Sequence, residues 1–254
     1  ESDPAFRGYL MEGYRPSRFN APREGVWLAD ATSSGEMCEY PLGPDGRLGS
    51  EGETHVEIAS PQHCGLGGGE YYAIGRGPGL SDDQRVDDLY SAVWTGPALA
   101  RSVDIMGRPK LRLTLASETA QGQVCVRLNH VHPDGASTRI SFGVLNLTHR
   151  ESSAAPEEML IGKPVELEIE LDHIAYRVPE GHRIAVAVST AYWRLIWPSA
   201  DAGRVTVSGW ALRLPERALA VADEWNFEEA TGAAGWHTGY RGAQSNGKLG
   251  VSGQ

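Results

Sequence analysis

The chain has 254 residues, a formal net charge of −10 at pH 7 and a hydrophobic share of 41%. Its 31 glycines and 15 prolines are spread without a period. This distribution excludes a collagen-like protein and argues against a helical bundle, because both residues disrupt helix interiors. The hydrophobic content suffices for a folded core, and the length allows one large domain or two small ones.

The charge and the hydropathy pattern also restrict the partners. A negative surface without a cluster of Lys or Arg repels phosphate groups, so we expect neither nucleic acid nor an anionic membrane surface as a partner. No apolar run is long enough to span a bilayer. The sequence starts at Glu1 rather than Met, without a signal-like segment, so we expect a piece of a longer soluble polypeptide. The compartment stays open, with the cytoplasm slightly favoured.

Alternation of apolar and polar residues predicts β-strands. Residues 110–115 and 165–171 alternate strictly, and the second segment places Glu166, Glu168 and Glu170 on one face that must be wet. Further strands are predicted over residues 124–128, 140–147, 184–188 and 205–214.

Turn residues and helix breakers complete the fold prediction. Pro133-Asp134-Gly135 and Pro179-Glu180-Gly181 each predict a β-hairpin. Only two short helices are expected, near residues 82–90 and 216–224. Many short strands with few helices indicate an all-β jelly-roll β-sandwich.

Several segments lack strand periodicity. Residues 60–80 form a glycine-rich loop, and the polar stretch 232–254 is expected to be a surface wrap or partly disordered. The three cysteines, Cys38, Cys64 and Cys125, are odd in number and lack metal-type spacing, so we expect small buried hydrophobes.

A serine nucleophile on a strand-to-helix elbow needs glycine two residues before it and two after it. Ser245 is followed by Gly247 but preceded by Ala243, and Ser252 is preceded by Gly250 but followed by Gln254. The sequence therefore contains no acyl-transfer nucleophile of this class.

Two pairs, His130 with His132 and His63 with Cys64, have residue types that serve in metal binding or catalysis. The pair His130-x-His132 has the spacing of a cupin metal motif, but the Glu of that motif is missing and a turn follows at once. A hairpin end with two polar caps is therefore expected instead. His63 and Cys64 are adjacent, so on extended chain they point apart and cannot share a proton.

The acidic run Asp82, Asp83, Asp87 and Asp88 lacks the alternating ligands and central glycine of a calcium loop. We expect it to cap a short helix, with Arg85 as an ion-pair partner. The cluster at residues 65–69 does not lie between a parallel strand and a helix, so simple flexibility is favoured over a phosphate-binding loop.

Four aromatic residues near one strand end offer an alternative function. If Tyr192, Trp193, Trp197 and Trp210 are exposed, they could stack on sugar rings and make the chain a carbohydrate-binding module. Packing at a domain interface is the competing interpretation.

Longer segments resemble one family: the C-terminal jelly-roll domain of X-prolyl dipeptidyl-peptidases, cocaine esterase and α-amino acid ester hydrolases. The resemblance rests on five segments in family order between residues 81 and 217: SDDQRVDDLYSAVWTGPAL, VDIMGRPKLRLTLAS, VCVRLNHVHPDGASTRISFGVLNLTHR, VPEGHRIAVAVSTAYWRLIWPS and VSGWALRLPER. PAFRGYLMEGYRPS and APREGVWLAD, within residues 1–30, resemble the segment that joins the hydrolase domain to the jelly roll.

The resemblance implies a non-catalytic domain of a serine hydrolase, inactive alone, with no catalytic residue, cofactor or metal of its own. Its partners would be the α/β-hydrolase and helical cap domains of the parent enzyme, with a homo-oligomer possible. It further implies a connector over residues 1–50, a jelly roll over 51–217 and a tail of unassigned structure over 218–254.

In this family a loop of the jelly roll lends apolar side chains to the acyl-side wall of the substrate pocket. The matching positions are Tyr71 and Tyr72, and the alternative is that both pack between the sheets. Five residues are expected to lock the loop entering the sandwich: Asp82, Gln84, Arg85, Asp87 and Asp88. His182 is expected to cap exposed carbonyls, and Arg150 to contact another domain.

Overall fold

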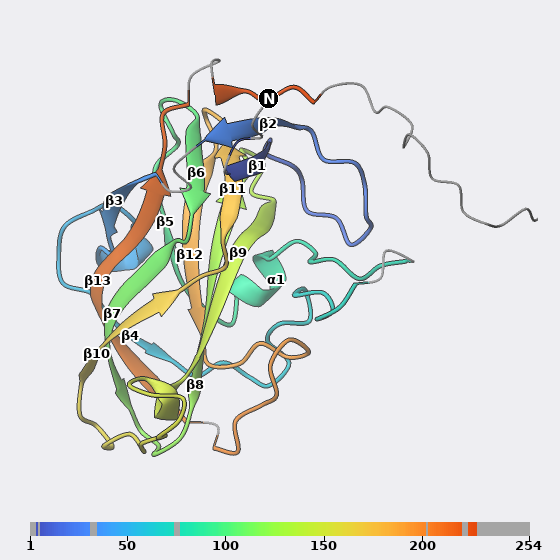
Figure 1. The fold of residues 1–254 in the computed structure, drawn as a ribbon. Coiled ribbons are helices and arrows are strands. Elements are labelled where there is room, and N and C mark those ends of the chain that lie inside the picture. The colour runs from blue at the N-terminus through green and yellow to red at the C-terminus, as the bar shows by residue number, and fades with distance from the viewer. Residues whose placement is uncertain are drawn as a thin grey trace, which may run out of the picture.

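The computed structural model describes residues 4, 6–30, 35–73, 77–201, 203–219 and 223–227. Two β-sheets face each other across one hydrophobic core, and in these residues the sheets form a sandwich rather than a closed barrel (Figure 1). This confirms the predicted all-β jelly-roll class. The strands and helices are β1 (Phe6–Met11), β2 (Gly25–Asp30), β3 (Glu36–Pro41), η1 (Pro44–Gly46), β4 (His55–Ile58), α1 (Arg85–Asp88), β5 (Ala92–Thr95), β6 (Val103–Gly107), β7 (Lys110–Ser117), β8 (Gln123–Val131), β9 (Ser137–Asn146), η2 (Leu147–His149), β10 (Val165–Glu170), β11 (Ile174–Val178), β12 (Arg183–Ser189) and β13 (Val205–Glu216).

The larger sheet has the order β10-β7-β13-β6-β11-β1-β2, with β3 and β4 also paired to β13, and the smaller sheet has the order β5-β12-β8-β9. The six strands predicted from periodicity all form, with bounds that differ by a few residues. Their alternation explains the core. On β7, Leu111, Leu113 and Leu115 are fully buried, whereas the intervening side chains are only partly buried.

The predicted wet face of residues 165–171 is confirmed, because Glu166, Glu168 and Glu170 are exposed on β10. This strand lies at the edge of the larger sheet and pairs with β7 alone. The Lys110 ammonium lies 2.8 Å from carboxylate oxygens of both Glu168 and Glu170. Opposite charges on neighbouring strands thus offset the carboxylate repulsion along the edge.

Only one of the two predicted hairpins is correct. Pro133-Asp134-Gly135 joins β8 to β9, which pair antiparallel, and Gly135 adopts a φ of 86°. Pro179-Glu180-Gly181 instead connects β11 of the larger sheet to β12 of the smaller sheet, so the prediction of a hairpin there is wrong. Turn residues specify that the chain reverses, but not which sheet the next strand joins.

Of the two predicted helices, again only one is correct. A short helix forms within the predicted range 82–90 as α1. The helix predicted over residues 216–224 is wrong in its described part, because Glu216 ends β13 and pairs with Glu36 of β3. Pairing with β3 and β6 keeps Glu216 in the sheet, and this tertiary context outweighs the local helix propensity.

Both ends of the described chain contact the larger sheet. Strand β1 pairs in parallel with β11 and antiparallel with β2, and β3 pairs with β13. Near the C-terminal end the Trp225 amide donates to the Trp27 carbonyl at 2.7 Å. The prediction for residues 232–254 falls outside the described residues.

The three cysteines are free, as expected, with Cys64 and Cys125 buried and Cys38 only partly so. Among the described residues, no helix is long and apolar enough to cross a membrane.

Candidate functional site

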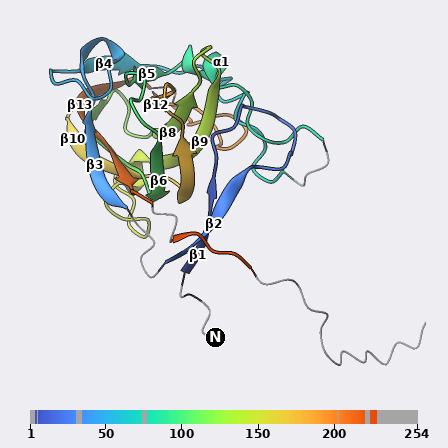
Figure 2. The ribbon, with the colours of Figure 1, turned by 90° about the horizontal axis from the view of Figure 1, so that it is seen from above.

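Two long loops lie on the same side of the sandwich. The glycine-rich loop (residues 65–80, of which 65–73 and 77–80 are described) projects there beside the β1–β2 connection (residues 12–24), and both views agree on this (Figures 1 and 2). The amides of Gly79 and Leu80 each donate to the Arg18 carbonyl at 3.0 Å. Two segments about 60 positions apart in sequence thus form one surface.

The base of the glycine-rich loop lies directly against the backbone after β12. Gly65 has a φ of 106°, and a Cβ at this position would lie 2.6 Å from the Trp193 backbone nitrogen. The Trp193 amide donates to the Cys64 carbonyl at 2.7 Å. Glycine at position 65 is therefore required both by the positive φ and by the close approach.

Two buried side chains of the α1 region hold this loop. The Asp87 carboxylate accepts hydrogen bonds from the amides of Gly65 at 2.8 Å and Gly67 at 3.0 Å. The Gln84 side-chain amide donates to the Gly67 carbonyl at 2.9 Å. Because Gln84 and Asp87 are almost completely buried, these bonds are shielded from water, which raises the cost of breaking them.

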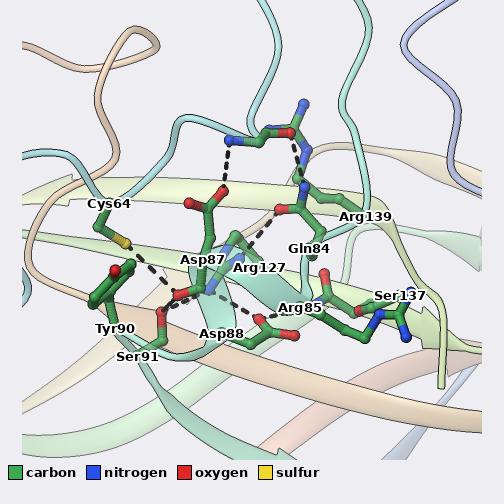
Figure 3. Close-up of polar contacts among 12 residues, drawn as sticks. Cys64, Gln84, Arg85, Asp87, Asp88, Tyr90, Ser91, Arg127, Ser137 and Arg139 are labelled. Carbon is green, nitrogen blue, oxygen red and sulfur yellow. Dashed lines mark hydrogen bonds and ion pairs between the residues drawn. The ribbon is translucent and has the colours of Figure 1, made fainter.

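Arg127 connects the same group to the smaller sheet (Figure 3). Its side chain, from the middle of β8, has no exposed surface and lies 3.0 Å from the Asp88 carboxylate. The guanidinium also donates to the Ser91 hydroxyl at 2.6 Å and to the side-chain oxygen of Gln84 at 3.2 Å. We call Gln84, Asp87, Asp88, Ser91 and Arg127 the anchor network.

Tyr192 and Arg139 extend the anchor network toward the loop surface. The Tyr192 hydroxyl donates to the Gln84 side-chain oxygen at 2.9 Å and accepts from Arg139 at 2.7 Å. The expected locking role of the acidic segment is therefore confirmed for Gln84, Asp87 and Asp88. Asp83 forms the exposed ion pair with Arg85 at 2.7 Å, and Asp82 accepts from the Asp83 amide.

Burial controls the electrostatics of the anchor network. It raises the pKa of Asp88 to about 6, and the attraction of Arg127 offsets this shift only in part. Burial alone would lower the pKa of Arg127, but Asp88 and Tyr192 hold it above its ordinary value. Arg127 therefore stays charged, and its charge requires the polar partners around it.

A hollow of about 360 Å³ lies at the foot of the glycine-rich loop. The Arg23 guanidinium lies 3.7 Å from the centre of the Tyr14 ring, and Arg139 lies 4.7 Å from that of Phe142. The hollow thus combines aromatic faces with charges of both signs. Six of its lining residues are Tyr14, Arg23, Glu70, Arg139, Phe142 and Asp172.

Tyr71 and Tyr72 follow the anchored part of the loop, with 85% and 77% of their surface exposed. The alternative in which both pack between the sheets is therefore wrong. Glu70, directly before them, lines the hollow, whereas the tyrosines do not. Sequence periodicity could not decide this, because two adjacent aromatics in a glycine-rich segment have no strand or helix pattern.

The remaining loop motifs have structural roles. His63 packs edge-on against the Tyr90 ring, while the Cys64 sulfur faces the Asp87 carbonyl at 3.8 Å, so the two side chains diverge as expected. Burial raises the pKa of the Cys64 thiol, which disfavours a nucleophilic thiolate. The amides of Gly65 and Gly67 that a phosphate would need are already bound to Asp87.

The four aromatics of the carbohydrate-binding alternative do not form one exposed surface. Tyr192 is completely buried in the anchor network, so it does not meet the exposure that this alternative requires. Trp193 and Trp197 contact each other at 5.6 Å between ring centres, and Trp197 is 81% exposed. Trp210 lies on β13 and donates to the Thr114 hydroxyl on β7.

The structure brings His130 and His132 together with His182. The sequence did not indicate this partner, because His182 lies 52 positions after His130, just before β12, the strand that pairs with β8. His182 was expected to cap carbonyls, but its Nδ1 lies 2.6 Å from Nε2 of His130. Burial lowers the pKa of His130 to about 3, and the pKa values of His132 and His182 are also lowered, mainly by burial. The three rings are thus neutral at pH 7.

Arg150, expected at an interdomain contact, bonds locally. Its guanidinium donates to the carbonyls of Leu147 at 3.1 Å and Glu157 at 2.6 Å. These contacts close the loop that follows β9.

Replacing Asp87 by alanine should release the glycine-rich loop, because two loop amides lose a charged acceptor. Hydrogen bonds to charged groups contribute about 1.5–3 kcal/mol each, so we expect a loss of about 3 kcal/mol in the free energy of unfolding. Urea unfolding measures this. The matched control is Asp201→Ala, an exposed aspartate, expected to change stability by less than about 0.5 kcal/mol. Equal effects of the two substitutions would contradict the anchoring role.

Asp88 should give the stability a distinctive pH dependence. Its folded-state pKa of about 6 lies above the ordinary 3.8, so its contribution is fully present below about pH 4 and is lost as the pH rises through about 6. Relative to Asp88→Asn, the wild-type free energy of unfolding should fall by on the order of 2 kcal/mol across this window. Urea unfolding at a series of pH values checks this, and a pH-independent difference would refute it.

Comparison with known proteins agrees with this architecture. Residues 20–242 match the family described as the X-Pro dipeptidyl-peptidase C-terminal non-catalytic domain. No curated protein sequence matches the chain.

Three solved structures share the fold. An aminopeptidase from a marine sediment Thaumarchaeota archaeon has a TM-score of 0.61 at 19% identity, covering 76% of this chain and 39% of the aminopeptidase. An α-amino acid ester hydrolase has a TM-score of 0.57 at 17% identity, covering 70% of this chain and 36% of the ester hydrolase. A CocE/NonD family hydrolase from Staphylococcus aureus has a TM-score of 0.60 at 11% identity, covering 84% of this chain and 42% of the hydrolase.

The chain thus spans well under half the length of each of these proteins, and at such identities the likeness establishes the fold. The family match covers most of the described sandwich together with part of the N-terminal segment. The chain therefore belongs to the family of X-Pro dipeptidyl-peptidase C-terminal non-catalytic domains.

Proposed function

We propose that this chain is the C-terminal β-sandwich of a serine hydrolase of the dipeptidyl-peptidase or ester-hydrolase type, and that its glycine-rich loop completes the substrate pocket of the catalytic domain. Tyr71 and Tyr72 would form part of the acyl-side wall. Residues 51–217 would be the main part of the sandwich. Residues 1–50, whose strands β1, β2 and β3 join the larger sheet, would connect it to an α/β-hydrolase domain.

The observation that carries this proposal is the combination of exposed aromatics and a fixed base. Tyr71 and Tyr72 are mostly exposed, yet they follow a backbone held by Asp87 and Gln84 inside the sandwich. Large aromatic surface exposed on a monomer indicates a site of contact with another molecule or domain. A base fixed by buried hydrogen bonds would position these rings against a substrate without a large loss of entropy.

Exposed apolar side chains of α1 and of the start of the glycine-rich loop support a domain contact on this side of the sandwich. The helix α1 and the start of the glycine-rich loop both lie there (Figure 1). Val86, Leu89 and Leu66 are 57%, 81% and 51% exposed. Covering them against the hydrolase or cap domain would remove apolar surface from water. A homo-oligomer remains a further prediction.

The sequence supports a non-catalytic role for this chain, because no serine has the flanking glycines of a nucleophile elbow. The chain alone should therefore neither hydrolyse a proline peptide or acyl ester nor react with an active-site serine probe. The nucleophile, its acid and its histidine would belong to the catalytic domain.

The test of the pocket wall uses the full-length parent enzyme with Tyr71→Ala and Tyr72→Ala. Removing a wall contact should lower kcat/KM for the preferred substrate about tenfold or more and change the preference among acyl groups. Tyr71→Phe and Tyr72→Phe should retain most of the activity, because the ring rather than the hydroxyl forms the wall. Steady-state kinetics on substrates with small and large acyl groups measure this.

The matched control is Leu160→Ala, which removes a 70% exposed apolar side chain before β10. It should leave all kinetic parameters unchanged. If the alanine variants at positions 71 and 72 behave like this control, with folding intact, the pocket-wall role is wrong. Hydrolysis by the isolated chain would overturn the non-catalytic role instead.

A further inference from the structure

Three histidines from two separate turns lie together at one end of the sandwich. His130 is near the end of β8, His132 follows that strand, and His182 precedes β12. One ring nitrogen from each lies within 4.8 Å of the others. His130 and His132 are buried and His182 is half-buried. We call them the histidine cluster; no other group of this kind occurs among the described residues.

The surroundings fix the orientation of His132. Its Nε2 lies 3.1 Å from the Tyr14 carbonyl oxygen, which can only accept, so Nε2 carries the hydrogen and donates it. The Thr138 hydroxyl donates to the same carbonyl at 2.9 Å. In a neutral ring the lone pair of His132 is therefore on Nδ1.

His130 has a similar outer partner. Its Nδ1 lies 2.8 Å from the Tyr176 hydroxyl, which also accepts from the Tyr14 amide. When Nδ1 of His130 donates to this hydroxyl, the lone pair of His130 is on Nε2, the atom that faces His182. Histidines that bind a metal almost always donate their second ring N–H to an oxygen acceptor in this way.

The short contact inside the cluster is the remaining observation. Nε2 of His130 and Nδ1 of His182 are 2.6 Å apart. Without a cation this contact is a hydrogen bond in which one ring N–H donates to the other ring, and a bound cation would replace that hydrogen. Tetrahedral zinc with Zn–N distances of 2.0–2.1 Å holds its nitrogens about 3.3 Å apart. The close pair must therefore separate by about 0.7 Å, and nitrogens that are now up to 4.8 Å apart must approach by about 1.5 Å, so binding requires a side-chain shift. His182 is on a turn and only half-buried, so it can supply that shift.

We propose that the histidine cluster binds one divalent d-block cation of the zinc type. Imidazole nitrogens suit Zn²⁺ and Co²⁺, whereas Mg²⁺ and Ca²⁺ prefer oxygen ligands. The fourth position is left to water on the partly exposed side of His182. The cation would join the β8–β9 turn to the β11–β12 crossover, and through Tyr14 and Tyr176 it would fix the segment that follows β1.

The test is a titration of the untagged, chelator-treated chain with Co²⁺, followed by its visible absorption, with Zn²⁺ as the competitor. We expect saturation at one Co²⁺ per chain, bands of a four-coordinate ion, and displacement by Zn²⁺ but not by Mg²⁺. His182→Gln should abolish this binding. The matched control His55→Gln removes an exposed histidine on β4 and should bind like the wild type.

Two further measurements keep the proposal decidable if His182→Gln folds poorly. Tyr176→Phe removes the hydroxyl beside His130 and should weaken Co²⁺ binding about 10-fold or more. X-ray absorption on the zinc-loaded wild type should count three imidazole nitrogens. The proposal is overturned by the absence of saturable binding, by a folded His182→Gln that binds normally, or by fewer than three imidazole ligands.

Discussion

The buried charge of Arg127 is the constraint on which the loop side of the molecule depends. A guanidinium cannot give up its proton in a protein, so a completely buried one must be surrounded by acceptors. Arg127 obtains them from Asp88, Ser91 and Gln84, all on or beside α1. A helix of a single turn, too short to be stable alone, is thereby held on the smaller sheet.

The same hydrogen bonds connect the core to the glycine-rich loop at the surface. The Gln84 side-chain oxygen accepts from Arg127, and its nitrogen donates to the Gly67 carbonyl. The Asp87 carboxylate accepts from the amides of Gly65 and Gly67. The loop base is thus held by buried hydrogen bonds, although it has no regular structure. Function in this fold would depend on such a loop, because the inner faces of the two sheets are occupied by core packing.

The sequence predicted most clearly what depends on local pattern. The alternation in β7 and β10 determined which side chains are buried, and the acidic segment correctly suggested a locking role. The crossover at Pro179 was missed because a turn sequence does not specify the next strand's sheet. The loop amides bound by Asp87 and the approach of His182 to His130 depend on contacts 20 or more positions apart, which no local pattern encodes.

The central claim, that a buried carboxylate holds the glycine-rich loop, is tested most directly by amide hydrogen exchange in the wild-type chain. The amides of Gly65 and Gly67 should exchange as slowly as those of the central strand β8, since both donate to the carboxylate of Asp87, a residue that is 1% exposed. Exchange of these two amides as fast as that of residues 71–73 would contradict it.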